Sequence, residues 1–235
     1  MRKALFFVMG TAFILAPVAM LAQSKPTAAT YITDEEVKAV NALPGIDRTI
    51  RVVDIGPENF AIGVIHRAAP GARGTGAGGG AGAGGGAGRG TGAGAGAGAG
   101  GAAGRGAAPA AEPCGEQITA PPTGGTPGMI AHDQQTEGYL IISGSGTLVT
   151  GGKIVNGRKS AAESEVTKVL NGPSCSGMAV GADIVKKVVK TGDIIIIPAM
   201  VPHGWTDITD HVDYLSFRPS ARVLEAGYTN PALKK

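Results

Sequence analysis

The sequence lacks a strong charge bias, which limits the partners it can attract. It contains 21 Lys and Arg against 18 Asp and Glu. Two of the basic residues, Arg2 and Lys3, lie in an N-terminal segment that we expect to be removed, and without them the chain is close to neutral. A near-neutral chain gives little support for binding to nucleic acid or to an acidic membrane surface. We therefore expect no nucleic-acid partner.

Long apolar runs are also scarce, and the longest lies at the N-terminus. Arg2 and Lys3 precede an apolar segment from Ala4 to Met20, and Ala22 offers a small residue before a cut. This order predicts a signal peptide over residues 1–22 and a secreted or periplasmic protein. A membrane anchor is disfavoured because a span needs about 20 apolar residues, and no later run is long enough to cross a bilayer. No Cys follows the cut, which argues against a lipid anchor.

The chain has only two cysteines, Cys114 and Cys175. In an exported protein an even pair favours one disulfide; the alternative is two separate buried thiols. Both residues lie in Pro- and Gly-flanked stretches, EPCGE and GPSCSG, which we interpret as loops. This placement favours the bridge.

Helical periodicity is confined to one short stretch. Thr33 and Glu36 form a capping-box pattern, and Val37, Val40 and Leu43 follow at helical spacing before Pro-Gly ends the element. We expect a short helix packed on the outside of a larger body.

The remaining ordered sequence is rich in short β-type runs separated by turn residues. These runs are TIRVVDIG, NFAIGVIHRA, EGYLIISGSGTLVTGGKIVNG, ESEVTKVL, DIVKKVVKTG, DIIIIP and HVDYLSFRP. Recurring strands without a long helical period predict an all-β sandwich or barrel. DIIIIP does not alternate, which predicts a strand that is covered on both faces.

Residues 71–111 are almost entirely Gly and Ala, with Arg73, Arg89 and Arg105 spaced through them. Such a segment has too little apolar surface to bury, so we expect a disordered insertion. The alternative, an RG-type nucleic-acid segment, lacks the aromatic residues that stack on bases. The expected single domain then consists of residues 23–70, holding the helix and first strands, and residues 112–235, holding the rest of a barrel.

Ligand-capable residues stand just ahead of an apolar strand in HDQQTEGYLIISGSG, residues 132–146. His132 is followed by Glu137 and Gly144, and Gly128 precedes it. A second stretch, GDIIIIPAMVPHGWTD, supplies Gly192, Pro198 and His203 in the same order of residue types.

Together the two stretches resemble the two motifs of the cupin superfamily, over roughly residues 126–218. The chain departs from the family pattern at Ile130, where the first His is expected, at Met200, which replaces a Gly, and at Asp207, which replaces an Asn. The resemblance implies a double-stranded β-helix, the cupin jelly roll, with a short N-terminal helix and the Gly/Ala insertion as additions.

The resemblance also implies a divalent metal held by His132, Glu137 and His203. Two imidazoles and a carboxylate suit Fe, Mn, Zn, Ni or Cu. A metal-dependent enzyme on a small polar molecule follows, either a dioxygenase or an isomerase or lyase. The alternative is a non-catalytic module that binds a sugar or organic acid. Catalytic residues beyond the ligands are not assigned, and a homodimer is left open.

Further residues are candidates for contacts with the small molecule. Alternation on a strand predicts that Tyr139 and Ile141 share the face of Glu137. Two residues after His132 on the expected strand, Gln134 is a candidate fourth ligand or substrate donor. The remaining candidates are Trp205, expected at the rim, and Arg67 and Arg218, which end strands and would fix an anionic group unless they form surface salt bridges. His66 is a weaker candidate for the pocket, and His211 is expected in a solvated turn.

Overall fold

The computed structural model describes residues 25–69, 111–120 and 122–234. The predicted signal peptide (1–22) and all but the last residue of the predicted insertion (71–111) lie outside the described residues. The elements are α1 (Asp34–Asn41), β1 (Asp47–Asp54), β2 (Asn59–Ala68), β3 (Pro113–Cys114), β4 (Thr126–His132), β5 (Glu137–Thr150), β6 (Lys153–Lys159), η1 (Val166–Leu170), β7 (Ser174–Val180), β8 (Val185–Lys190), β9 (Ile194–Ile197), β10 (His203–Thr206), β11 (His211–Ser220) and η2 (Pro231–Leu233).

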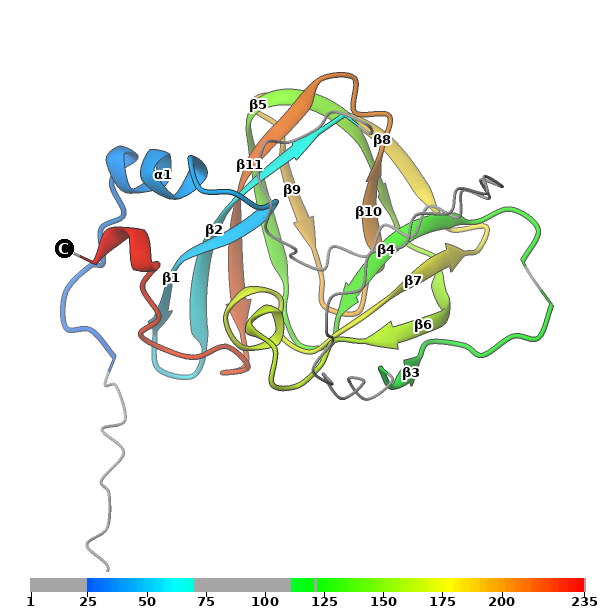
Figure 1. Ribbon diagram of the computed structural model, residues 1–235, viewed down its shortest axis with the longest axis horizontal. Coiled ribbons are helices and arrows are strands. Elements are labelled where there is room, and N and C mark those ends of the chain that lie inside the picture. The colour runs from blue at the N-terminus through cyan, green and yellow to red at the C-terminus, as the bar shows by residue number, and fades with distance from the viewer. Residues whose placement is uncertain (1–24, 70–110, 121, 235) are drawn as a thin grey trace, which may run out of the picture.

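Two antiparallel sheets share the long strand β5. The first sheet runs β1-β2-β11-β5-β9, and the second runs β3-β6-β7-β4-β10-β5-β8. The first half of β5 pairs with β11 and β9, and its second half pairs with β10 and β8. Figure 1 shows β1, β2 and β11 on one side of the molecule and β4, β6 and β7 on the other. This is the predicted all-β jelly roll.

The stretch Gly-Ser-Gly at 144–146 lies within β5, which bends there and continues to Thr150. The backbone of Gly144 has φ +69°, and a Cβ at this position would lie 2.0 Å from the carbonyl oxygen of His211. Only glycine fits so close an approach. Gly128 (φ +72°) and Gly192 (φ +92°) also have left-handed backbones. These left-handed residues lie at the bend of β5 (Gly144), within β4 (Gly128) and in the turn before β9 (Gly192).

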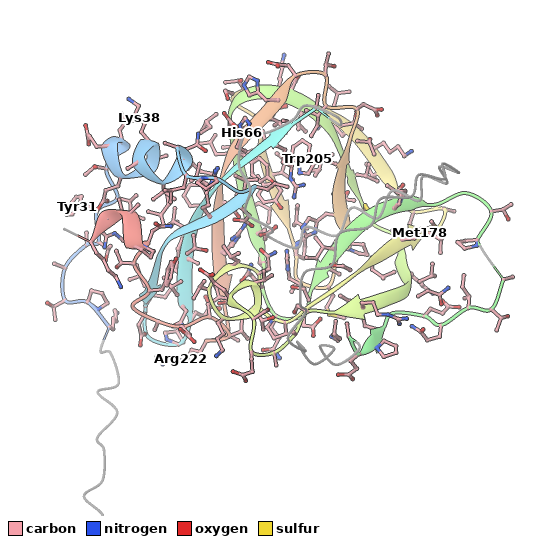
Figure 2. The ribbon with its side chains drawn as sticks, viewed as in Figure 1. Tyr31, Lys38, His66, Met178, Trp205 and Arg222 are labelled. Carbon is pink, nitrogen blue, oxygen red and sulfur yellow. A yellow bond between two sulfur atoms is a disulfide. The ribbon has the colours of Figure 1, made fainter. Side chains whose placement is uncertain are left out.

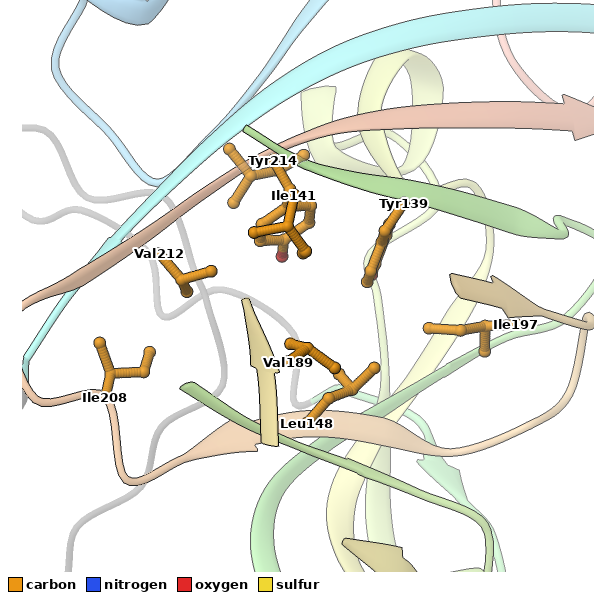
Figure 3. Close-up of a cluster of buried hydrophobic side chains, with 9 residues drawn as sticks. Tyr139, Ile141, Leu148, Val189, Ile197, Ile208, Val212 and Tyr214 are labelled. Atoms are coloured by element: carbon orange, nitrogen blue, oxygen red, sulfur yellow. The ribbon is translucent and has the colours of Figure 1, made fainter. Parts of the chain in front are cut away.

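The main hydrophobic core fills the space between the sheets. It contains Ile65, Tyr139, Ile141, Leu148, Val189, Ile197, Ile208, Val212 and Tyr214. In Figure 3, Tyr139, Ile141 and Tyr214 face Leu148 and Val189. Full burial of such side chains stabilises the fold by about 1.5–3 kcal/mol each.

Helix α1 covers the outer face of β1 and β2, as predicted. Thr33 and Glu36 form the reciprocal capping box, and Val40 is fully buried against Ile50 and Val64. In the part of the chain that the structure describes, no helix has the length and hydropathy of a membrane span.

Two of the strand predictions are wrong, one because the segment is helical and the other because the strand is covered on one face only. ESEVTKVL contains a π-helical turn, η1, because the hydroxyl of Ser164 accepts the backbone N–H of Thr167 and favours a helical start. DIIIIP forms the edge strand β9, which pairs only with β5 among the described strands. Ile194 and Ile196 are each 74% exposed, so this strand is covered on one face only.

Cys114 and Cys175 form the predicted disulfide and join β3 to β7, with Cα atoms 5.9 Å apart. Both cysteines lie in strands, whereas the sequence placed them in loops. The bridge closes a loop with a sequence separation of 61 residues. In the chain-entropy model this stabilises the fold by roughly 4 kcal/mol.

The bend in β5 can be tested by adding a methyl group to two glycines. Gly144→Ala should lower the free energy of unfolding by about 3 kcal/mol or more, because the new Cβ meets a backbone carbonyl. Gly192→Ala is the matched control, since its backbone is also left-handed but no atom lies within 4 Å of the added Cβ; we expect a loss of about 1 kcal/mol. Urea denaturation measures both, and equal losses would contradict the close approach.

Candidate metal centre

Three strands bring His132, Glu137 and His203 together. His132 ends β4, Glu137 begins β5 and His203 begins β10. Strand β10 pairs with both other strands, and His203 lies opposite Ile130 of β4. One ligand atom from each of the three residues lies within 4.8 Å of the others. Among the described residues no other group of three His, Cys, Asp or Glu meets this condition.

The two imidazoles present Nε2 to one oxygen of the carboxylate. The Nε2 atoms of His132 and His203 lie 3.5 and 3.2 Å from Oε2 of Glu137. The three side chains are between 2% and 4% exposed. Figure 2 shows the ribbon with its side chains and labels Trp205, which follows His203 by two residues in β10. Bulk water therefore does not fill the space between the three atoms.

Hydrogen bonds on the far side of each ring fix which nitrogen faces Glu137. Nδ1 of His203 lies 3.0 Å from the carbonyl oxygen of Val201, which can only accept, so this nitrogen carries the hydrogen. Nδ1 of His132 lies 2.9 Å from Oγ of Ser174, and that hydroxyl has the carbonyl of Gly172 as an acceptor at 2.9 Å. In the neutral rings both Nε2 lone pairs then point toward a carboxylate oxygen. The lone pairs of the two Nε2 atoms and of Oε2 of Glu137 therefore face one another, an arrangement that can bind a cation.

The other carboxylate oxygen is held by Arg218. Its Nε donates to Oε1 of Glu137 at 2.7 Å and to Oγ of Ser216 at 2.9 Å, and its Nη2 pairs with Asp47 at 2.5 Å. The hydroxyl of Tyr139 donates to Oε2. Arg218 and Tyr139 thus fix the orientation of the carboxylate from two sides.

These contacts set the protonation of the centre. Burial opposes ionisation of Glu137, but the charge of Arg218 and the contacts with His132 and His203 outweigh it, so the pKa of Glu137 lies well below its usual value. Burial and the nearby Glu137 carboxylate raise the pKa of Tyr139 well above its usual value. The centre therefore contains an ionised carboxylate and a protonated phenol.

The alternative predicted for Arg218, a surface salt bridge, is wrong. The residue is 1% exposed, so it forms no surface salt bridge. Each of its three nitrogens has a partner in the interior: Glu137 and Ser216 for Nε, the carbonyl of Leu170 for Nη1 and Asp47 for Nη2. The sequence could not show this, because Asp47 lies 171 positions away along the chain.

The expectation that Gln134 shares a strand face with His132 is wrong. Strand β4 ends at His132, and Gln134 lies exposed in the bend that follows. The next residue, Gln135, is buried instead and 1% exposed. Tyr139 faces inward beside Glu137, as predicted. Trp205 is partly buried and packs against the interior core.

The two remaining histidines lie away from the centre. His66 is exposed, and its Nδ1 lies 2.6 Å from Asp213. His211 was expected in a solvated turn, but it begins β11 and its Nε2 lies 3.1 Å from Oγ of Ser143. Both belong to a polar network on the outside of the first sheet, and they provide controls for the interior histidines.

The ionised state of Glu137 predicts a pH dependence of stability. Because its pKa is lowered in the folded protein, its charge stabilises the fold above the unfolded pKa of about 4.3. That contribution is lost as the pH falls through the lower folded value. The difference in free energy of unfolding between wild type and Glu137→Gln should be largest above about pH 5 and shrink toward pH 2, in urea titrations. Glu58→Gln, an exposed control, should differ little from wild type at any pH, and a constant difference for Glu137→Gln would contradict the account.

No protein-family model and no curated protein match the chain. Solved structures that resemble it include a candidate mannose-6-phosphate isomerase from Ralstonia eutropha, with TM-score 0.30 and 11% identity over 77% of this chain and 94% of that chain. An oxalate oxidase has TM-score 0.31 and 13% identity over 94% of this chain and 71% of that chain. Peruvianin-I, a cysteine peptidase from Thevetia peruviana latex, has TM-score 0.30 and 10% identity over 82% of this chain and 77% of that chain.

The TM-scores and identities of these three structures are too low to support a conclusion about function. The function therefore has to be inferred from the residues of this chain. The two motifs predicted a jelly roll and a convergence of His132, Glu137 and His203, and both are present. The fold and this group of residues are consistent with the cupin superfamily.

Proposed function

We propose that His132, Glu137 and His203 bind one divalent transition metal and that the protein is a metal-dependent enzyme acting on a small molecule. The observation that supports this most directly is the arrangement of two Nε2 atoms around one carboxylate oxygen, with each Nδ1 already hydrogen-bonded. Hydrogen bonds on the outer nitrogen are the usual support of a metal-binding imidazole.

The residues around the centre favour a dioxygenase-type reaction over an isomerase or lyase. Two His and one carboxylate hold non-haem Fe(II) in oxygenases, and such a metal supplies open positions for a substrate and for O₂. An isomerase or lyase would also need a group that moves a proton on the substrate. The nearest hydroxyl is that of Tyr139, and it already donates to Glu137. Val201 and Ser174 orient the rings, and Arg218 orients the carboxylate.

One observation favours a second function, a non-catalytic module that binds a sugar or organic acid. The three ligand residues are almost completely buried, which suits a site that holds a metal without turnover. Water exchange separates the two functions. Mn²⁺ in an enzyme centre should enhance the relaxation of bulk water protons through an exchanging water, whereas a sealed centre should give no enhancement.

The place of action belongs to the same proposal. We infer that the protein works in a secreted or periplasmic setting after loss of residues 1–22. The Cys114–Cys175 disulfide supports this, because such bridges persist in oxidising compartments.

Metal binding can be tested with histidine variants. His132→Ala and His203→Ala should each weaken Mn²⁺ binding by more than about 100-fold, because each removes one of three ligands. His211→Ala should bind as wild type does, since His211 lies outside the centre. Calorimetry gives the affinity, and Trp205, the only Trp in the chain, gives an independent fluorescence signal. Equal binding by wild type and His203→Ala would exclude the proposed centre.

A further inference from the structure

The guanidinium of Arg218 lies between two carboxylates, and only one of them belongs to the metal centre. Its Nε donates to Oε1 of Glu137 at 2.7 Å, and its Nη2 donates to Oδ2 of Asp47 at 2.5 Å. The arginine is 1% exposed, so water and salt screen it little from either carboxylate. A change of charge at Asp47 therefore alters how strongly the guanidinium attracts Glu137.

Asp47 reaches the guanidinium from the outermost strand of the first sheet. It begins β1, whereas Glu137 begins β5, and β2 and β11 lie between these two strands (Figure 1). Asp47 lies opposite Ile65 of β2, which lies opposite Tyr214 of β11, and both partners are buried in the core. Cross-strand partners share a face of the sheet, so Asp47 shares the inner face. Arg67 donates to the hydroxyl of Tyr214 at 3.1 Å instead, so Arg218 is the arginine that pairs with Asp47.

Gly63 on β2 leaves room for the guanidinium between β11 and β1. A Cβ at this position would lie 3.3 Å from Nη1 and 3.5 Å from Cζ of Arg218, so an added methyl group would displace the guanidinium by a few tenths of an ångström. Glycine weakens the interior of a strand and often marks a close approach by another group. The position of Gly63 thus favours the contact between Arg218 and Asp47.

Hydrogen bonding alone does not explain why a carboxylate stands at position 47. Its Oδ2 accepts from Arg218, but its Oδ1 is buried and has no partner among the described residues. A buried oxygen without a donor is costly, and the neutral amide of Asn would accept the hydrogen bond from Nη2 equally well. What the carboxylate adds at this position is its negative charge.

We propose that Asp47 is a positioning residue for the metal-binding carboxylate and that it acts on Glu137 through Arg218. This rests on the proposed function, because it concerns the same centre. Asp47 balances part of the charge of the arginine, which leaves Oε2 of Glu137 with more negative charge to offer a cation. The hydrogen bond from Nη2 to Asp47 also fixes the guanidinium that orients Glu137. Such supporting groups tune the affinity of a metal site without contacting the metal.

A purely structural role for Asp47, which would tie β1 to the barrel, makes a different prediction. Loss of a tie would lower the free energy of unfolding but leave the Mn²⁺ affinity of the folded protein unchanged. Asp54 is the matched comparison, because it lies on the same strand, is 5% exposed and pairs with Arg222 at 3.1 Å. Arg222 donates to Asp54 and to the carbonyl of Gly56, neither of which is a ligand residue.

The experiment measures Mn²⁺ binding by calorimetry and stability by urea denaturation on the full-length mature chain. Asp47→Asn should weaken Mn²⁺ binding by about 10–100-fold, as is usual when a group that supports a metal ligand is lost. Asp47→Glu keeps the charge and should recover most of the affinity. Gly63→Ala should also weaken binding, because the methyl group displaces the guanidinium. Asp54→Asn should lower the stability but bind Mn²⁺ as wild type does.

Two further measurements separate positioning from structural support. At saturating Co²⁺, Asp47→Asn should show a shifted visible absorption band, since the carboxylate ligand has changed, whereas Asp54→Asn should match wild type. Arg218→Lys lacks the fork that spans both carboxylates. Adding Asp47→Asn to Arg218→Lys should therefore change the Mn²⁺ affinity by less than about twofold, because the path between the two carboxylates is already lost.

Equal Mn²⁺ affinity of wild type and Asp47→Asn would overturn the inference, and so would an equal loss in Asp54→Asn. A full loss from Asp47→Asn in the Arg218→Lys background would show that the arginine does not transmit the effect. If Asp47→Asn does not fold, Gly63→Ala decides, and wild-type affinity in that variant contradicts the path through Arg218. All these results leave the metal centre in place, whereas absent Mn²⁺ binding by wild type contradicts the centre and this inference together.

Discussion

The buried carboxylate of Glu137 is the constraint on which the centre of the molecule depends. A carboxylate that is 2% exposed has lost its hydration and would cost several kcal/mol without compensation. Arg218 and Tyr139 provide that compensation, and both side chains are themselves buried. Arg218 reaches on to Asp47 of β1 and to the carbonyl of Leu170 in η1. One ionised group thus connects β1, β5, β11 and the helical turn, and it orients the oxygen that faces the two histidines.

The sequence was sufficient for the parts of the protein that depend on local spacing. The capping box at Thr33, the strand alternation from Glu137 to Ile141 and the motif spacing around His203 are all short-range patterns, and each is found in the structure. What the sequence missed depends on partners that are far apart along the chain or on sheet position. Arg218 and Asp47 meet only after β1 and β11 take their places around β2. Whether DIIIIP forms a central strand or an edge strand also depends on which strands pair with it. Four consecutive Ile residues are compatible with either position in a sheet.

The departures from the family motifs have physical consequences in the fold. Met200 stands where the motif has Gly, and its backbone has φ +68° while its N–H donates to the carbonyl of His132 at 2.7 Å. A side chain in this left-handed region costs about 1 kcal/mol relative to glycine, and the hydrogen bond to His132 offsets part of that cost. Asp207, where Asn is usual, also has a left-handed backbone (φ +49°), which Asp tolerates better than most residues. Ile130 faces His203 across the strand pair and leaves the centre with three protein ligands.

Anomalous diffraction from crystals grown with Zn²⁺ tests the central claim most directly, because it locates the metal without reference to activity. The account predicts one strong peak inside the barrel, about 2.0–2.2 Å from Nε2 of His132, Nε2 of His203 and Oε2 of Glu137. Arg218 should remain on the other carboxylate oxygen. A barrel interior without a peak, with zinc bound only at the exposed His66, would contradict the assignment of these three residues as a metal centre.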